Sequence, residues 1–178
     1  MKTLATLIAA TTLFWIGNSE AHGPTREKHS ESVEISASPE AVWALIGDFA
    51  HPERWMPAIE STTAQGGTEK GALRELKLKP AGGLLKEELK NYDADKKTVQ
   101  YKVVDPTDPS ILPVNNYSAK LSVEANGTGS KVEWDAAFYR WFLNNNPPDG
   151  QNEAAAKLAV EKLMKESLAN LKIVAERK

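Results

Sequence analysis

The feature that most constrains the fold is an amphipathic segment at residues 152–175. It follows the run Asn-Asn-Asn-Pro-Pro-Asp-Gly at residues 144–150, which can propagate neither helix nor strand and therefore predicts a turn. An apolar stripe repeats every three or four positions through Ala156, Val160, Leu163, Ser167, Leu171 and Val174, and Ala159, Met164, Leu168 and Ala175 widen it. Lysine and glutamate residues lie between them. The segment predicts one long helix, about 36 Å at about 1.5 Å per residue, that buries one face against the rest of the chain.

The sequence upstream of this helix predicts short strands. Alternation at residues 33–37 predicts the first strand, and Ser38 followed by Pro39 and Glu40 predicts a helix start. This helix, at residues 39–46, and a second short one at 51–55 precede six more strands at residues 59–65, 71–79, 84–92, 98–104, 114–125 and 130–141. An antiparallel sheet with one long helix on its face is an α+β arrangement.

Composition narrows the classes of function. A chain of 178 residues, 41% hydrophobic and 26% charged, is typical of a single globular domain. The formal net charge of −2 and the lack of a lysine or arginine block argue against nucleic acid as a partner. The sequence contains no cysteine, which excludes disulfides, thiolate metal sites and cysteine nucleophiles. We expect no cofactor.

Residues 1–21 have the pattern of an export signal. Lys2 provides a short positive region, residues 4–16 are apolar apart from threonines, and Ser19 and Ala21 place small residues around a cleavage site. The pattern predicts cleavage after Ala21 and a mature chain in the bacterial periplasm, or secreted. The apolar run is too short for a membrane anchor, which needs roughly 20 residues.

Residues 22–31 are polar and without a period, which predicts a flexible arm ahead of a single domain at residues 32–178. After cleavage the new N-terminal His22, with His29 nearby, could bind copper. A metal site needs more convergent donors than these two, so we expect no metal site. We expect His51, a lone histidine beside a proline, to be structural or exposed.

Alternation assigns each strand an inward and an outward face. On the strand at residues 84–92, Glu87 shares its face with Leu85 and Leu89, so an acid lies among inward residues. The other inward sets include aromatic and small residues that could line an interior: Tyr101, Tyr117, Ala119, Trp134 and Phe138.

A buried carboxylate is destabilising unless it is paired, hydrogen-bonded or hydrated, so Glu87 indicates a polar interior that contains water. Arg74 has the inward parity of a counter-charge. Small inward residues such as Ala119 leave room that large ones would fill, and we therefore predict a pocket. The alternatives are a slipped register that puts Glu87 at the surface and Glu88 inside, or a position of both residues at a strand end.

A series of short segments runs in order along the chain: residues 38–43 (Ser-Pro-Glu-Ala-Val-Trp), 47–49, 55–57, 71–76, 87–89, 92–93, 116–117 and 129–134. Together these segments resemble the SRPBCC superfamily, which includes START domains, plant hormone receptors, birch-pollen-allergen-like proteins and polyketide cyclase-like proteins. The resemblance implies a helix-grip fold, in which a curved seven-stranded antiparallel sheet surrounds the long C-terminal helix. It also implies a cavity for a hydrophobic or amphipathic small molecule.

The same resemblance places Glu87, Tyr101, Tyr117 and Ala119 on the cavity wall. It makes residues 79–84 and 111–114 the loops that flank the entrance. The helix stripe and the inward faces add further candidates for ligand contact: Trp134, Phe138, Ala156, Val160, Leu163 and Met164. For the bulky members of this set, filling of a solid core is the competing explanation.

The segment at residues 112–117 (Leu-Pro-Val-Asn-Asn-Tyr), together with the export signal, is similar to the MxaD-type family of periplasmic proteins found with methanol dehydrogenase systems. This similarity implies an accessory role that supports the interaction of methanol dehydrogenase with its cytochrome c. We therefore expect a non-enzymatic periplasmic binding or accessory protein that takes a small hydrophobic or amphipathic ligand.

Two other functions stay open at this point. One is a cyclase- or hydrolase-like enzyme in which Glu87 is the general base, with its pKa raised toward neutral by burial. The other is a protein-interaction module whose surface is the Asn/Pro loop with the aromatic residues Phe138, Tyr139, Trp141 and Phe142. Of these, Tyr139 and Trp141 have outward parity. Coverage of these two aromatic side chains by the helix end or the N-terminal arm is the competing explanation.

Overall fold

The computed structural model describes residues 23–80, 82–104 and 106–177, so the predicted export signal and His22 lie outside the described residues. The described part forms a seven-stranded antiparallel sheet in the order β1-β7-β6-β5-β4-β3-β2. Its elements are β1 (Glu27–Ile35), α1 (Pro39–Ile46), η1 (Pro52–Arg54), β2 (Ile59–Gln65), β3 (Leu73–Leu78), β4 (Leu84–Asp93), β5 (Thr98–Val103), β6 (Val114–Asn126), β7 (Gly129–Arg140) and α2 (Glu153–Ala175).

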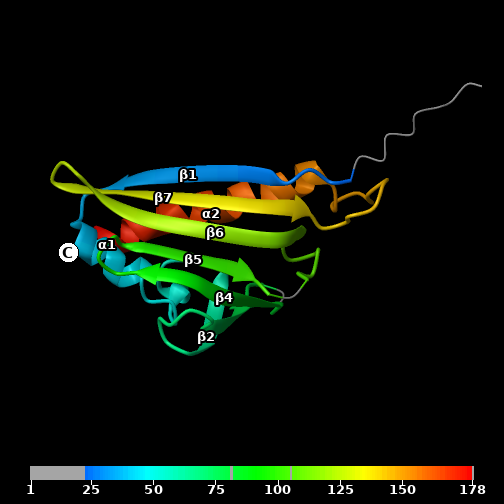
Figure 1. The fold of residues 1–178 in the computed structure, drawn as a ribbon. Coiled ribbons are helices and arrows are strands. Elements are labelled where there is room, and N and C mark those ends of the chain that lie inside the picture. The colour runs from blue at the N-terminus through cyan, green and yellow to red at the C-terminus, as the bar shows by residue number, and fades with distance from the viewer. Residues whose placement is uncertain (1–22, 81, 105, 178) are drawn as a thin grey trace, which may run out of the picture.

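Figure 1 shows the long helix α2 running along one face of the curved sheet. The helix packs most closely on β1 and β7, which form one end of the strand order. The strands at the other end curve away from it. This is the α+β helix-grip fold that the sequence predicts, with α1 and the single 3-10 turn η1 as the two short helices after the first strand.

Local signals explain where α2 begins and which face it buries. The Asn152 side chain caps the helix by accepting a hydrogen bond from the Ala155 N–H at 2.9 Å. Arg140 at the end of β7 forms an ion pair with Glu153 in the first turn, which fixes the helix start against the sheet. The buried residues follow the predicted stripe: Ala156, Val160, Met164, Ser167, Leu168 and Leu171.

The first strand is longer than predicted, and this corrects the flexible arm. Residues 27–35 pair with β7 from Glu27 opposite Phe138 to Ile35 opposite Ser130, so half of the predicted arm is strand. The inward positions of this early part are half-buried polar residues, including His29 and Glu31, rather than apolar ones. Because the alternation was carried by polar side chains, hydropathy did not indicate it.

The predicted inward faces of β3 to β7 are confirmed, and Glu87 rather than Glu88 points inward. The β6–β7 hairpin turns through Gly127 and Thr128, with Asn126 paired to Gly129. A Cβ atom on Gly129 would lie 2.3 Å from the Ile35 carbonyl oxygen, so this close approach of backbones requires glycine. Among the described residues, no helix has the length and hydropathy needed to cross a bilayer.

Candidate functional site

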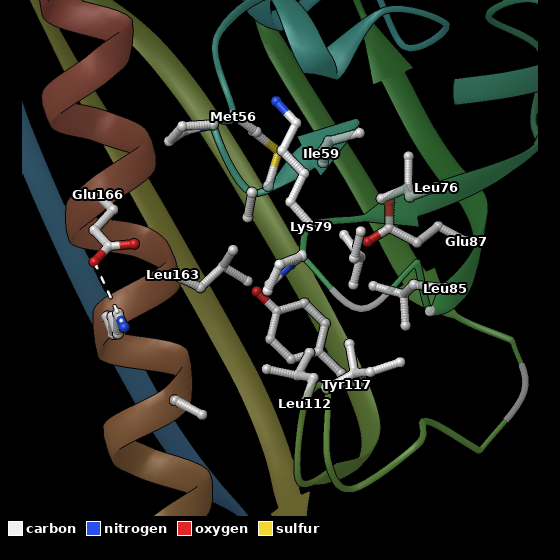
Figure 2. A pocket seen from close by; sticks show the side chains of 18 of the residues that line it. Met56, Ile59, Leu76, Lys79, Leu85, Glu87, Leu112, Tyr117, Leu163 and Glu166 are labelled. Carbon is white, nitrogen blue, oxygen red and sulfur yellow. Dashed lines mark ion pairs between the residues drawn. The ribbon is translucent and has the colours of Figure 1, made fainter. Parts of the chain in front are cut away.

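A cavity of about 470 Å³ lies between α2 and the part of the sheet that curves away from it. Figure 2 shows α2 on one side and side chains from the sheet and its loops on the other. Most of the lining side chains are apolar, among them Met56, Ile59, Leu76, Leu78, Leu85, Ile111, Leu112, Ala159 and Leu163. The polar ones are Lys79, Glu87, Tyr101, Ser110, Tyr117, Lys162 and Glu166. Pockets of this size and composition are typical of small-molecule sites.

The most buried charges of the site form one ion pair. The Arg74 Nε donates to Glu87 Oε2 at 2.6 Å, and the two residues are only 5% and 4% exposed. They lie opposite each other on β3 and β4. A second guanidinium nitrogen donates to the Phe49 carbonyl oxygen at 3.1 Å. The predicted counter-charge is therefore present, and the pair is held in place by the strand register.

Two aromatic rings flank the guanidinium of this pair. Its central carbon lies 4.1 Å from the Phe49 ring centroid and 4.9 Å from the Tyr101 ring centroid. Contact with aromatic faces stabilises a cation that has lost its water. Burial raises the pKa of Glu87, and the charge and hydrogen bond of Arg74 oppose that shift. Arg74 thus limits the penalty of placing an acid on the cavity wall.

Tyr117 enters the cavity because of an irregularity in β6. The pairing of β6 with β7 shifts register between Asn115 and Ser118, and Asn116 between them has a positive φ of 49°. Such bulges turn a strand and redirect a side chain. The Tyr117 ring stacks on Phe138 with ring centroids 6.3 Å apart. Figure 2 shows its hydroxyl pointing into the cavity toward α2.

The Tyr117 hydroxyl has no hydrogen-bond partner among the described residues, although the residue is only 2% exposed. The Tyr101 hydroxyl and the Trp134 indole are close enough to influence its pKa, but neither is in hydrogen-bonding geometry with it. Burial raises the pKa of Tyr117, so the phenol stays protonated. A buried hydroxyl without a partner is destabilising and is ready to bond a ligand or a water molecule.

Two loops meet at the entrance of the cavity, as the resemblance implied. Lys79, Pro80 and Gly83 line it from the β3–β4 loop, and Ser110 and Ile111 line it from the loop before β6. A Cβ atom on Gly83 would lie 1.7 Å from Ile111 Cδ1, so the absence of a side chain at Gly83 lets the two loops touch.

The ten candidate contact residues fall into two groups. Glu87, Tyr101, Tyr117 and Leu163 line the cavity. The other six are buried outside it: Ala119, Trp134, Phe138, Ala156, Val160 and Met164. These six residues belong to β6, β7 and α2 and lie in the hydrophobic core. Their inward direction was predicted well, but they are buried in the core rather than on the cavity wall.

Several wall residues were not expected from the sequence. Met56 and Ile59 come from the turn after η1 and the start of β2, and Ala159, Lys162 and Glu166 come from the border of the α2 stripe. At the border of its apolar stripe a helix can face a gap rather than a packed neighbour. The border position could therefore have indicated that Ala159, Lys162 and Glu166 line a cavity. No periodic signal exists for the turn at residue 56.

The aromatic side chains predicted to be a surface for protein contact are partly covered. The Trp141 indole donates to the Thr107 carbonyl oxygen at 2.5 Å. The Arg26 guanidinium lies 5.9 Å from the Tyr139 ring centroid. Both aromatic residues are half-buried, so the loop before β6 and the N-terminal segment provide the coverage.

The histidines of the described part do not gather with other metal ligands. His29 is hydrogen-bonded to Glu31 at 2.8 Å, and the exposed His51 lies 3.5 Å from Asp48. Within residues 23–177, apart from the two omitted positions, no cluster of three or more histidine, aspartate or glutamate residues could hold a metal ion. The copper hypothesis depended on His22, which is outside the described residues.

A curved sheet closed by a C-terminal helix over an amphipathic cavity defines a helix-grip protein of the SRPBCC superfamily. A family profile described as polyketide cyclase / dehydrase and lipid transport matches residues 26–176. The chain belongs to this family. No curated protein sequence matches it.

Solved structures agree with this assignment. The protein XoxI from Bacillus cereus is 28% identical with a TM-score of 0.66, and the match covers 82% of this chain and 93% of that one. The ZhuI aromatase/cyclase from Streptomyces sp. R1128 is 14% identical with a TM-score of 0.70, covering 86% and 95% of the two chains. Ara h 8.0201 is 17% identical with a TM-score of 0.65, covering 85% and 98%. The last two similarities concern the fold alone.

Proposed function

We propose that this protein binds a small amphipathic molecule in the cavity under α2 and acts as a binding or accessory protein rather than as a catalyst. The observation that carries the proposal is a cavity of about 470 Å³ with apolar walls, into which Tyr117 directs a buried hydroxyl without a partner. Apolar walls with a few placed polar groups are what a ligand site needs for affinity and orientation.

The condition of Glu87 favours binding over acid/base catalysis. A general base must reach the proton that it abstracts, and one Glu87 oxygen already accepts a hydrogen bond from Arg74. The described residues that line the cavity include no histidine. An ion pair of this kind shapes and neutralises the wall without itself reacting.

A cyclase- or hydrolase-like enzyme is the second candidate, because burial raises the pKa of Glu87 and this residue faces the cavity. Glu87→Gln separates the two functions. An enzyme that uses this base would lose about 10²–10⁴-fold in turnover, whereas a binding protein would change only in affinity.

We further propose that the protein acts in the periplasm, with methanol dehydrogenase and its cytochrome c as partners. The pattern of residues 1–21 supports export to the periplasm, and the similarity of residues 112–117 to the MxaD-type family supports an accessory role toward methanol dehydrogenase and its cytochrome c. Within this segment Leu112 lines the cavity and Asn116 is exposed, so ligand binding and partner contact would occur at neighbouring places. An added dehydrogenase or cytochrome should then increase the mass of the protein in native mass spectrometry.

Native mass spectrometry under gentle and denaturing conditions tests the binding function directly. The protein purified from cells that produce it should carry a stoichiometric small molecule that is lost on denaturation. An empty monomer that gains mass only with the dehydrogenase or cytochrome would place the function on the surface instead.

A cavity-filling substitution supplies the matched test. Ala159→Phe puts a ring into the cavity, whereas Ala154→Phe makes the same change at an exposed position of the same helix. Binding of the neutral fluorescent probe N-phenylnaphthylamine should fall at least about tenfold in the first variant, since several apolar contacts are lost. It should be unchanged in the second. Equal binding by both variants would contradict the cavity as the site.

A further inference from the structure

Lys79 is an exposed lysine at the cavity entrance. The ammonium of Lys79 makes no ion pair and no hydrogen bond with any of the described residues. Its backbone N–H donates to the Ala58 carbonyl oxygen at 2.8 Å, which holds this residue beside the cavity wall. Figure 2 shows the Lys79 side chain extending between Met56 and Ile59 at the edge of the space.

The other charges of the lining are neutralised within the protein. Lys162 lies 3.9 Å from Glu166 on the next turn of α2, and Glu87 is paired with Arg74. Lys79 therefore remains as the one unbalanced charge among the described lining residues. An unpaired cation beside an apolar space favours a ligand that brings a negative charge.

The interior offers a different polar group. The Tyr117 hydroxyl stays protonated and lacks a partner, so it can donate a hydrogen bond to a neutral acceptor. Between Lys79 and Tyr117 lie apolar side chains from both walls, including Leu163 from α2. The cavity thus has a cationic mouth, an apolar middle and a hydrogen-bond donor inside.

We propose that the ligand is an amphipathic carboxylic acid with an oxygen substituent on its apolar body. Its carboxylate lies at Lys79, its hydrocarbon lies along Leu163 and the apolar sheet residues, and its keto or hydroxyl oxygen accepts a hydrogen bond from Tyr117. This inference rests on the proposed binding function and adds the class of ligand and the orientation in which it lies.

Calorimetric titrations with a set of laurate derivatives test whether Lys79 binds the carboxylate at the cavity entrance. The wild-type protein should bind laurate about threefold more tightly than lauryl alcohol, the scale of an exposed ion pair, and lauryltrimethylammonium least tightly. Lys79→Met should remove the preference for the anion. Lys157→Met is the matched control, since this lysine is exposed on α2 and does not line the cavity, and it should keep the preference. Added salt should weaken the preference of the wild type and leave Lys79→Met unchanged.

A mid-chain keto derivative of laurate tests the hydrogen bond from the Tyr117 hydroxyl inside the cavity. It should bind the wild type about fivefold more tightly than laurate, the scale of one neutral hydrogen bond to an otherwise unpaired group. Tyr117→Phe keeps the ring stacked on Phe138 and should abolish this advantage while it leaves the affinity for laurate unchanged. Circular dichroism and thermal unfolding confirm that each variant is folded.

The outcomes separate this inference from the function on which it rests. If no probe of any charge binds, the binding function itself is wrong. If laurate and lauryl alcohol bind equally, and Lys79→Met and Tyr117→Phe change neither preference, the cavity binds ligands but the assignment of an oxygenated carboxylic acid is overturned.

Discussion

On the inward face of β7, a strand on which α2 packs, Trp134 and Phe138 have 0% exposed surface. On the inward face of β4, at an equivalent depth, Glu87 lies paired with Arg74 on the wall of a cavity. We call these regions the packed half (β1 and β7) and the open half (β6, β5, β4, β3 and β2) of the sheet. Both have the same alternation of inward and outward residues, but only the first touches the helix closely.

The comparison shows how one sheet can serve as both core and site. The packed half holds the helix through apolar contact and through polar links such as that of Lys172 Nζ to the Glu34 carbonyl oxygen at 2.7 Å. The helix is thereby fixed at one end of the strand order, and the curvature of the sheet leaves the open half facing a gap. Polar residues are tolerated there because the gap admits water or a ligand.

The largest effect on stability is expected from a substitution in the open half. Arg74→Met leaves the buried Glu87 without its counter-charge and should reduce the free energy of unfolding by about 3–5 kcal/mol. Arg74→Met combined with Glu87→Leu removes both charges and should recover most of this loss. Urea unfolding at neutral pH measures both variants. An equal loss in the single and the double variant would show that Arg74 acts through its packing between Phe49 and Tyr101 instead.

Two neighbouring residues of α2, Met164 and Leu163, test the difference between the packed and the open half. Met164 has 0% exposed surface and does not line the cavity, so Met164→Ala should reduce the free energy of unfolding by about 3 kcal/mol. Leu163 borders the cavity, so Leu163→Ala enlarges a space that already exists and should cost only about 1 kcal/mol.

Ligand binding should separate these two variants in the opposite order. Leu163→Ala should weaken the binding of N-phenylnaphthylamine, because an apolar wall residue is lost. Met164→Ala should leave it unchanged under conditions where the protein is folded. Larger destabilisation by Leu163→Ala than by Met164→Ala would contradict the division of the sheet into two halves.

Much of the fold follows from local signals. Turn residues and alternation locate the strands, and the two-residue period of alternation predicts an inward direction for both Glu87 and Arg74, which the pairing of β3 with β4 confirms. The first strand was predicted too short because its inward positions, such as His29 and Glu31, are polar. These residues form a strand because they pair with β7, and this pairing cannot be predicted from hydropathy.

The site is harder to predict because alternation gives the direction of a side chain but not what lies in front of it. Trp134 and Tyr117 both point inward, yet α2 covers one and leaves the other beside a cavity. That difference depends on the curvature of the sheet and the path of the helix. The same holds for the missing partner of the Tyr117 hydroxyl, which arises from the bulge beside it.

Glu87 and Glu88 are adjacent on β4, face opposite sides of the sheet and should titrate on opposite sides of the usual glutamate pKa of 4.5. Burial raises the pKa of Glu87. Hydrogen bonds from Lys90 and then Lys102 lower the pKa of Glu88. Carbon-detected NMR titration of the two carboxyl groups measures both values. Arg74→Met should raise the pKa of Glu87 further, because it removes the charge and the hydrogen bond that oppose burial.

The two shifts have opposite effects on stability. A raised folded-state pKa means that the stability contribution of Glu87 is fully present below 4.5 and is lost as the pH rises through its folded value. A lowered one means that the contribution of Glu88 is present above 4.5 and is lost as the pH falls through its folded value. The destabilisation caused by Glu87→Gln should therefore shrink with rising pH, while that caused by Glu88→Gln should grow. A Glu87 midpoint at or below 4.5 would show that Arg74 outweighs burial. The open half would then behave as an ion-paired surface rather than as the wall of a low-dielectric cavity.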